Sequence, residues 1–463
     1  MTRALLLLID GLRADVAESE LAAGRLPHLQ ALTTHGARRR AATVFPSTTS
    51  VAYLPFLTGC LPGRCNVPSI RWLDRTQYRG RWWQDREAVR SYCGYQAGRL
   101  DTDIAPEIPT IFDLVPESVA IFSMITRGLR PDADRIQGAR KFWGTVSHYT
   151  ENHQPGDDAV ARELLRLTRT DWRFGFAQFP AVDGHTHAAH PTAPRVLASL
   201  HQADRTIGEV MRRLDDDTLL LVVSDHGAAP VTTHLDLATW FRARGARTLA
   251  HPVLWTRDPQ VAVMVAGNAQ AALYAAPGST RTTRLPWPAA RLPGAFGIAG
   301  DVVGMLLEEP AVALVAGEAA DGIVHVASRG GEATLHRRPS TIDYQPVTGD
   351  PLQLGGARSL SPAEWLDASL DTPFPDAAVN LIDQFRSART GDLVIAASEG
   401  HDFREAWERP EHKSGHGSLI AAHMLTPLWS NRPLPDRAFR TVDVFPRLLE
   451  HLGVPVPEGI DGD

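Results

Sequence analysis

Four short runs of apolar residues recur in the first half of the chain, and each run ends in polar residues or glycine. Apolar runs of about four to eight residues with such boundaries are typical of strands buried on both faces of a parallel sheet. The runs that we predict to be strands of one sheet are Ala4–Ile9, Val119–Met124, Phe174–Phe179 and Leu219–Ser224.

Helical patterns lie between these runs. Apolar residues recur at three- and four-residue spacing within Pro27–His35, Ala159–Thr168 and Pro194–Leu214, which is the periodicity of an amphipathic helix. Strands that alternate with helices predict an α/β fold, with a mostly parallel sheet and helices on both faces. In such sheets ligands bind outside the carboxyl ends of the strands, so functional residues are expected where each apolar run ends.

The pattern changes in the second half of the chain. Residues 231–390 carry many prolines, paired glycines and short β-like runs, which predict an inserted lobe of mixed α+β structure. The first pattern returns with a strand at Asp392–Ala397 and a helix at Thr441–Leu452. We therefore predict a core formed by residues 1–230 and 391–463, with 231–390 as a cap or substrate lobe.

The composition is that of an ordinary globular protein. Of 463 residues, 43% are hydrophobic and 22% are charged, which excludes a disordered chain, a collagen-like repeat and a disulfide-rich miniprotein. The formal net charge of −6 gives no basic field for a nucleic acid polymer. The apolar runs are far shorter than the roughly 18 residues of a membrane span. We expect neither a nucleic acid polymer nor a membrane as a partner.

Two further features predict a cytoplasmic location. The chain has only three cysteines, an odd number that fits a reducing compartment better than a disulfide framework. The first apolar run, Ala4–Ile9, is interrupted by Asp10 and Gly11, and it is shorter than the apolar region of about 7–15 residues in a signal peptide. A buried strand that ends in an acid is the better interpretation.

Acids and histidines gather where the apolar runs end. The candidate ligands are Asp10, Asp183, His187, Asp225, His226 and the glycine-flanked His416, with His185 and His190 as nearby alternatives. Each residue alone could equally be a helix cap or a solvated loop residue. Together, three acids and three histidines suit Zn²⁺ or Mn²⁺. Six ligands divide into two groups of three, and two ions about 3.5–4 Å apart stabilise the attacking and leaving oxygens of a displacement at phosphorus.

A cluster of hydroxyl side chains supplies nucleophile candidates. They are Thr43, Thr48, Thr49 and Ser50, shortly before Thr58-Gly59. A hydroxyl at the start of a helix is well placed to attack a phosphoryl group, because the unpaired N–H groups there attract an oxyanion. The alternative is a plain helix cap, which is the commoner role of serine and threonine.

The order of these motifs resembles the alkaline phosphatase superfamily, specifically its type I phosphodiesterase/nucleotide pyrophosphatase branch. The resemblance covers residues 1–230 and about 390–463 and implies an alkaline-phosphatase-like core. It implies two divalent ions, zinc with manganese as the alternative. One ion would be held by Asp10, Asp225 and His226 and would also bind the nucleophile, and the other by Asp183, His187 and His416.

The resemblance also selects the nucleophile. In this branch it lies ten residues before the glycine of the Thr-Gly pair, which is Gly59 here and selects Thr49, with Thr48 as the alternative. Many members place Phe-Pro-Asn directly after the threonine, whereas Phe45-Pro46 precedes it in this chain.

The implied activity is hydrolysis of phosphate esters, of the phosphodiesterase/nucleotide pyrophosphatase type, through a phospho-threonine intermediate. The expected substrate is a small phosphorylated molecule such as a nucleotide. Phosphomonoesterase, phosphonate hydrolase and phosphomutase activities, or an inactive binding homologue, are alternatives. A sulfatase is a further alternative, since Cys60-Leu61-Pro62-Gly63-Arg64 fits the sulfatase pattern, but this cysteine follows Gly59 instead of preceding the Thr-Gly pair.

Substrate preference depends on residues outside the ligand set. Ile70 stands where the branch tends to carry an asparagine that contacts a phosphoryl oxygen. Arg71 or Arg127 could bind a phosphate instead, which would favour a dianionic monoester. Asn268 is either a turn residue or a residue lining the cleft from the inserted lobe. The aromatic residues between positions 70 and 95 are either a wall of the substrate pocket or a small aromatic core.

Overall fold

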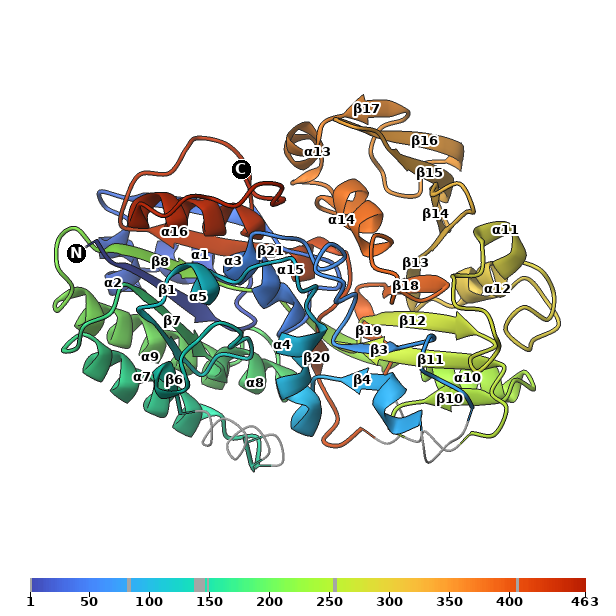
Figure 1. Cartoon of the computed structure of the whole chain (residues 1–463), viewed down its shortest axis with the longest axis horizontal. Helices are drawn as coiled ribbons and strands as arrows, with labels where there is room; N and C mark the ends of the chain where they lie inside the picture. Colours follow the sequence, from blue (N-terminus) through green and yellow to red (C-terminus); the bar gives the residue numbers. More distant parts are fainter. Residues whose placement is uncertain (1, 81–84, 137–145, 148–149, 253–255, 405–407) are drawn as a thin grey trace.

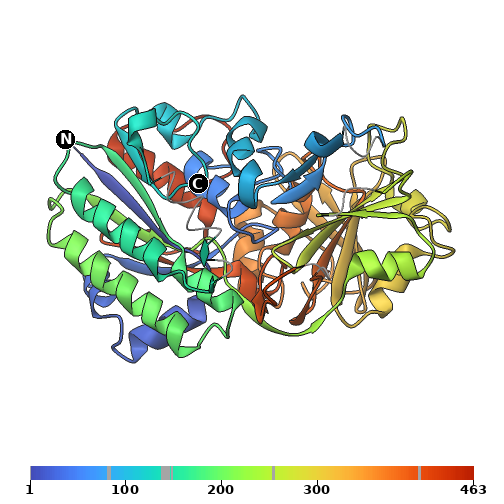
Figure 2. The same cartoon turned by 90° about the horizontal axis from the view of Figure 1, so that it is seen from below.

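Two large sheets, each with its own helices, organise the chain (Figure 1, Figure 2). The computed structural model describes all residues except 1, 81–84, 137–145, 148–149, 253–255 and 405–407. None of the helices in this described part combines the length and the apolar character that crossing a bilayer requires.

The first sheet has, within the described residues, eight strands in the order β22-β2-β21-β8-β1-β7-β5-β6. Their bounds are β1 (Ala4–Ile9), β2 (Ala37–Ala42), β5 (Ser118–Ile121), β6 (Asp134–Arg135), β7 (Phe174–Phe179), β8 (Leu219–Val223), β21 (Leu425–Ser430) and β22 (Phe439–Arg440). β1 lies between β7 and β8 and is parallel to both, with Ala4 opposite Phe174 and Leu219. Only β21 runs antiparallel to its neighbours, β8 and β2, so the prediction of a mostly parallel sheet is confirmed.

Helices cover both faces of this sheet, because successive residues of a strand point to opposite faces. Leu6 and Leu8 of β1 pack on one face in a core cluster that includes α3, α5 and α16. Leu5 and Leu7 pack on the other face with α1, α2, α7 and α9. The bounds are α1 (Ala14–Ala22), α2 (Pro27–Leu32), α3 (Leu54–Thr58), α5 (Ile111–Leu114), α7 (Gln154–Leu167), α9 (Pro194–Met211) and α16 (Val444–Leu452). The helices predicted between the apolar runs are therefore confirmed.

The second sheet has nine strands in the described part of the chain, in the order β10-β11-β12-β18-β13-β14-β15-β16-β17. Their bounds are β10 (Thr248–Ala250), β11 (Val261–Ala266), β12 (Gln270–Ala275), β13 (Val312–Glu318), β14 (Val324–Ser328), β15 (Gly331–Arg337), β16 (Ile342–Gly349), β17 (Arg358–Leu360) and β18 (Leu393–Ala397). All neighbouring pairs are antiparallel except β10 and β11. This lobe also contains α10 (Leu237–Ala243), α11 (Trp287–Ala290), α12 (Val302–Glu308), α13 (Pro362–Ser369) and α14 (Ala377–Gln384).

The strand predicted at Asp392–Ala397 forms, but its predicted placement in the parallel sheet is wrong. β18 lies inside the second sheet, antiparallel to both β12 and β13. A fully buried strand is a continuous apolar run in either kind of sheet, so its sequence does not reveal its partners. The division of the chain at residues 230 and 391 stays a prediction.

Two small sheets complete the described strands. One has the order β19-β9-β20, with β9 (Ala229–His234), β19 (Gly400–Asp402) and β20 (Ser414–Gly415), and the other pairs β3 (Arg71–Leu73) with β4 (Val89–Ser91). β9 follows directly from the carboxyl end of β8, and β20 pairs with it. Residues that follow β20 are thereby brought to the carboxyl edge of the first sheet.

Candidate active site

The predicted ligands come from the ends of three neighbouring strands and from the loop after β20. Because β7, β1 and β8 are adjacent, residues that follow them meet at one edge of the sheet. The structure places Asp10 after β1, Asp183 and His187 in α8 (Ala181–His187) after β7, Asp225 and His226 after β8, and His416 after β20. These six side chains form two groups of three, and all except the partly exposed His187 are buried.

The first group consists of Asp10, Asp225 and His226. Nε2 of His226 lies 3.5 Å from Oδ1 of Asp10 and 3.4 Å from Oδ2 of Asp225. The Oγ1 atom of Thr49 lies 3.0 Å from the same Nε2 atom. The hydroxyl selected as nucleophile therefore lies directly beside this group.

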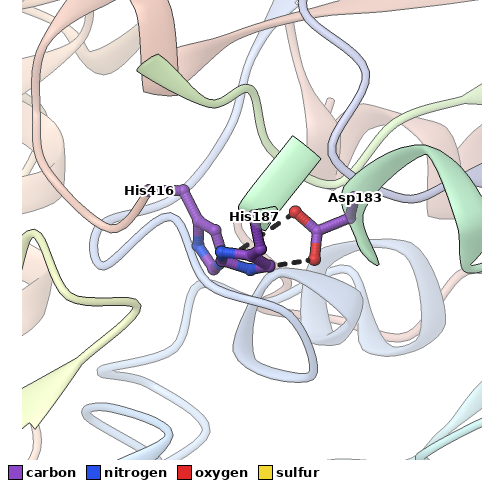
Figure 3. Close-up of side chains that lie close together, drawn as sticks. All are labelled: Asp183, His187 and His416. Atoms are coloured by element: carbon purple, nitrogen blue, oxygen red, sulfur yellow. Dashed lines mark hydrogen bonds and ion pairs between the residues drawn. The ribbon is translucent and has the colours of Figure 1, made fainter. Parts of the chain in front are cut away.

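The second group consists of Asp183, His187 and His416 (Figure 3). Nε2 of His187 lies 3.2 Å from Oδ2 of Asp183 and 3.3 Å from Nε2 of His416. Nε2 of His416 lies 4.0 Å from Oδ1 of Asp183. The rings of His226 and His416 stack with centroids 3.8 Å apart, so the two groups adjoin and form one centre.

The hydrogen bonds of the three carboxylates test whether cations fit here. Oδ2 of Asp10 accepts hydrogen bonds from Gln178 at 2.5 Å and Tyr53 at 3.2 Å, and Oδ1 of Asp225 accepts one from the Gly11 N–H. Within the described chain, Oδ1 of Asp10, Oδ2 of Asp225 and Oδ1 of Asp183 are buried and accept no hydrogen bond. A buried carboxylate oxygen without a partner is unfavourable. One such oxygen on each acid is what a cation site requires.

The three histidines are oriented in a way that also fits cations. In each ring Nδ1 faces a backbone carbonyl oxygen. The distances are 3.1 Å from His187 to Ser414, 3.1 Å from His226 to Gly227, and 3.0 Å from His416 to Ser47. Because a carbonyl oxygen can only accept, Nδ1 carries a proton in each ring, and Nε2 is the nitrogen that faces the ligand group. A backbone carbonyl on the second ring nitrogen is typical of metal-binding histidines.

The electrostatics point the same way. Burial and the neighbouring carboxylates raise the pKa of Asp10 well above its usual range, and burial raises the pKa of Asp225. Burial alone would lower the pKa of His187, but Asp183 beside it raises this pKa to about 9. Against the effect of burial, the same histidine keeps the pKa of Asp183 below its usual range. Asp10, Asp225 and His187 therefore favour protons, which a divalent cation would displace, whereas burial lowers the pKa of His416 and keeps that ring neutral.

The four candidate hydroxyls differ in exposure and contacts. Thr43, Thr48 and Ser50 are buried, and the Thr43 hydroxyl donates to the carbonyl of Asp225. Thr49 is partly exposed and contacts His226. Thr49 is therefore the one of the four that combines access with contact to a ligand, two residues before the short 3₁₀ helix Val51–Tyr53 that leads into α3.

Several alternatives lie outside the two groups. Nδ1 of His185 pairs with Ser199, and Nδ1 of His190 pairs with Thr192. Arg127 donates to backbone carbonyls of residues 104 and 105. Cys60, the residue of the sulfatase pattern, is buried in the apolar core with Cys65.

The aromatic segment is a core feature where the structure describes it. Trp72, Tyr78 and Tyr92 are at most 1% exposed. Trp72 and Tyr92 pack in the core cluster of the first sheet and Tyr78 packs in a smaller one with β11 and β12, so these three are core residues and do not form a separate aromatic core. Trp82 and Trp83 lie outside the described residues.

Other site residues were missed by the sequence interpretation. Tyr53 and Gln178 contact Asp10, and His412 stacks on His187. A polar glutamine inside the apolar run of β7 was the one signal that could have identified Gln178.

The chain is similar to known proteins in its family, its sequence and its fold. A family model described as type I phosphodiesterase / nucleotide pyrophosphatase matches residues 4–292. A phosphopentomutase of Caldanaerobacter subterraneus subsp. tengcongensis is 27% identical over 140 residues, which cover 30% of this chain and only 33% of that protein.

Among solved structures, phosphonoacetate hydrolase from Sinorhizobium meliloti in complex with phosphonoformate is similar with a TM-score of 0.59 and 15% identity, covering 97% of this chain and 96% of that one. Human ectonucleotide pyrophosphatase / phosphodiesterase 5 is similar with a TM-score of 0.56 and 13% identity, covering 100% of this chain and 97% of that one. At these identities the similarity shows the fold.

Proposed function

The chain belongs to the type I phosphodiesterase / nucleotide pyrophosphatase family, and from this membership we propose that it hydrolyses phosphate esters through a covalent phospho-threonine at Thr49. The observation that carries the proposal is the 3.0 Å contact between Oγ1 of Thr49 and Nε2 of His226 at the edge of the two ligand groups. In this position the Thr49 hydroxyl would lie within reach of a cation held by Asp10, Asp225 and His226, which would activate it as a nucleophile.

The donor set fits two divalent cations, zinc or manganese. Asp10, Asp225 and His226 would hold one, Asp183, His187 and His416 would hold the other, and when bound such ions supply Lewis-acid stabilisation of charge on the reacting oxygens.

The reaction proceeds in two displacements at phosphorus. In the first, the Thr49 hydroxyl gives up its proton to solvent and the Oγ1–P bond forms, while the bond from phosphorus to the leaving oxygen breaks and that oxygen departs with the electron pair. In the second, a water molecule gives up a proton as its oxygen attacks the same phosphorus, the bond to Thr49 breaks, and Oγ1 takes up a proton to restore the hydroxyl. Two inversions give net retention of configuration at phosphorus.

The chain's own residues keep this arrangement in place. Tyr53 and Gln178 fix the orientation of Asp10 through its Oδ2 atom. Gly11 has φ +71°, and a Cβ atom there would lie 2.7 Å from Oδ1 of Asp183. Glycine therefore permits the close approach of the strand ends that carry Asp10 and Asp183.

The substrate we propose is a small phosphorylated molecule such as a nucleotide, cleaved as a diester or pyrophosphate. A second candidate is a phosphomonoester or a phosphonate. It stays open because the buried apolar side chain of Ile70 offers no hydrogen bond where the branch tends to carry an asparagine that contacts a phosphoryl oxygen. A cytoplasmic location stays a prediction.

The test is a substrate panel on protein of known metal content. Nitrophenyl monoester, diester, phosphonate and sulfate substrates would be compared for wild type and Thr49→Ala, with a chiral thiophosphate for the stereochemical course. We expect retention and fastest turnover of the diester. Inversion would refute the covalent route, and a preference for the monoester or phosphonate would favour the second candidate.

A further inference from the structure

A layer of polar side chains lies against the second ligand group and has no part in the function proposed above. The rings of His412 and His187 are 4.3 Å apart between centroids, with 33° between their planes. Nδ1 of His412 lies 3.4 Å from Oε1 of Glu408 and 3.2 Å from Nδ2 of Asn268. The Asn268 amide also donates to both carboxylate oxygens of Glu408, at 3.2 and 3.1 Å. The three side chains thus form one connected network.

One member of this layer comes from the second sheet. Asn268 lies at the tip of the hairpin between β11 and β12, where its φ of +64° is one that asparagine tolerates better than most residues. The tip is joined to the backbone of His416 by two hydrogen bonds, from the His416 N–H to Gly267 and from the Ala269 N–H to His416, both 3.0 Å long. A Cβ atom on Gly267 would lie 2.7 Å from the His416 carbonyl oxygen, so glycine permits this docking.

The other two members precede His416 at regular spacing. Glu408, His412 and His416 are four residues apart. The backbone carbonyl of Ser414 fixes the edge of the His187 ring, and His412 covers a face of it. Glu408 is only 24% exposed in its side chain, so water screens its charge less than that of a surface acid.

The first ligand group has different supports. In the part of the chain that the structure describes, Asp10 is held by Tyr53 and Gln178, and Asp225 by the Gly11 N–H. An effect of the polar layer is therefore expected at the ion site of Asp183, His187 and His416, and not at the site of Asp10, Asp225 and His226.

We propose that Asn268, Glu408 and His412 are positioning residues of the ion site formed by Asp183, His187 and His416, and that through them the hairpin of the second sheet sets the cation affinity of this site alone. The network keeps the His187 ring in its binding orientation and adds one negative charge beside it. The proposal rests on the ion sites of the proposed function.

The experiment is a calorimetric titration of Zn²⁺ into the metal-free full-length protein. For wild type we expect two ions per chain. For Glu408→Gln we expect one of the two dissociation constants to rise by about 10-fold, the lower end of the effect of losing an outer partner of a metal ligand, because Glu408 acts on His187 through His412. The other constant should stay within about twofold. Asn268→Ala is expected to weaken the same site, and the double variant by less than the product of the single effects, because interacting residues are not additive.

Glu411→Gln is the matched control. Glu411 is three residues further on, is 62% exposed, and pairs with His234 and Arg404 instead of the His187 layer. We expect it to leave both constants unchanged. Circular dichroism and thermal melting of each metal-free variant show whether it has kept the fold.

The outcomes separate the two proposals. If wild type binds no zinc, the proposed function fails at its ion sites. If wild type binds two ions and Glu408→Gln leaves both constants unchanged, or weakens both equally, the positioning role is overturned while the proposed function stands.

Discussion

Asp157 offers a prediction whose size follows from the structure. It lies in α7, beneath the start of the helix α8 that carries Asp183 and His187. Its Oδ1 atom accepts a hydrogen bond from the Ala181 N–H at 2.9 Å, and its buried Oδ2 atom has no hydrogen-bond partner among the described residues. Burial raises the pKa of Asp157 from 3.8 to about 8. The folded protein therefore keeps this carboxyl protonated at pH 7.

The sign and the size of the effect follow from linkage. Between the unfolded pKa of 3.8 and the folded pKa of about 8, the unfolded state has lost this proton and the folded state has not. The free energy of unfolding therefore falls as pH rises through this window, by about 1.4 kcal/mol per pH unit. From pH 5 to pH 8 the loss at Asp157 is about 4 kcal/mol. Asp157→Asn keeps the acceptor for Ala181 and removes the titration. The free energy of unfolding of this variant relative to wild type should therefore rise by about 4 kcal/mol between pH 5 and pH 8.

The assay is thermal unfolding of both proteins at pH 5, 6.5 and 8. With an unfolding entropy of roughly 2.1 cal/mol/K per residue, 4 kcal/mol corresponds to about 4 °C for a chain of this length. Asp158→Asn, at the partly exposed neighbouring position, is the control and should follow wild type. A difference between Asp157→Asn and wild type that is the same at all three pH values would refute the reasoning.

Three further predictions concern the active site. Thr49→Ala should lower turnover by roughly 10⁴–10⁶-fold, as loss of a nucleophile does, with unchanged zinc content by elemental analysis; turnover within tenfold of wild type would exclude Thr49 as the nucleophile. Gly11→Ala places a Cβ atom 2.7 Å from the Asp183 side chain at φ +71°, so we expect a loss of about 1–3 kcal/mol in unfolding free energy together with lower zinc content, and equal values for both proteins would count against this. Dialysis against a chelator should lower the melting temperature and zinc should restore it, because each ion at 100 times its dissociation constant adds about 2.7 kcal/mol; a melting temperature indifferent to zinc would argue against buried ion sites.

The strands at the centre of the first sheet could be predicted because burial on both faces leaves an unbroken apolar run. Strands outside the centre of the sheet, such as β2 and β21, have no unbroken apolar run and could not be predicted in this way. β2 carries Arg38, Arg39 and Arg40, which are partly or fully exposed, so it has no continuous apolar run from which a strand could be predicted. β21 contains Pro427, which argues against a sheet interior.

The grouping of the candidate ion ligands was predictable for a related reason. In a parallel sheet, residues after neighbouring strands meet at one edge, so Asp10 and Asp225 are brought together by the strand order alone. His416 reaches that edge only through β20 and was predicted from its glycine-flanked motif and the family resemblance. Asn268 and His412 depend on how the hairpin of the second sheet docks against the loop after β20, and no local pattern encodes that contact.

The central claim is that two cations bind beside Thr49, and diffraction at the zinc absorption edge from crystals of zinc-loaded protein tests it most directly. We predict two anomalous peaks per chain, about 4 Å apart, one among Asp10, Asp225 and His226 and one among Asp183, His187 and His416. A single peak, or zinc bound away from these six side chains, would contradict the claim.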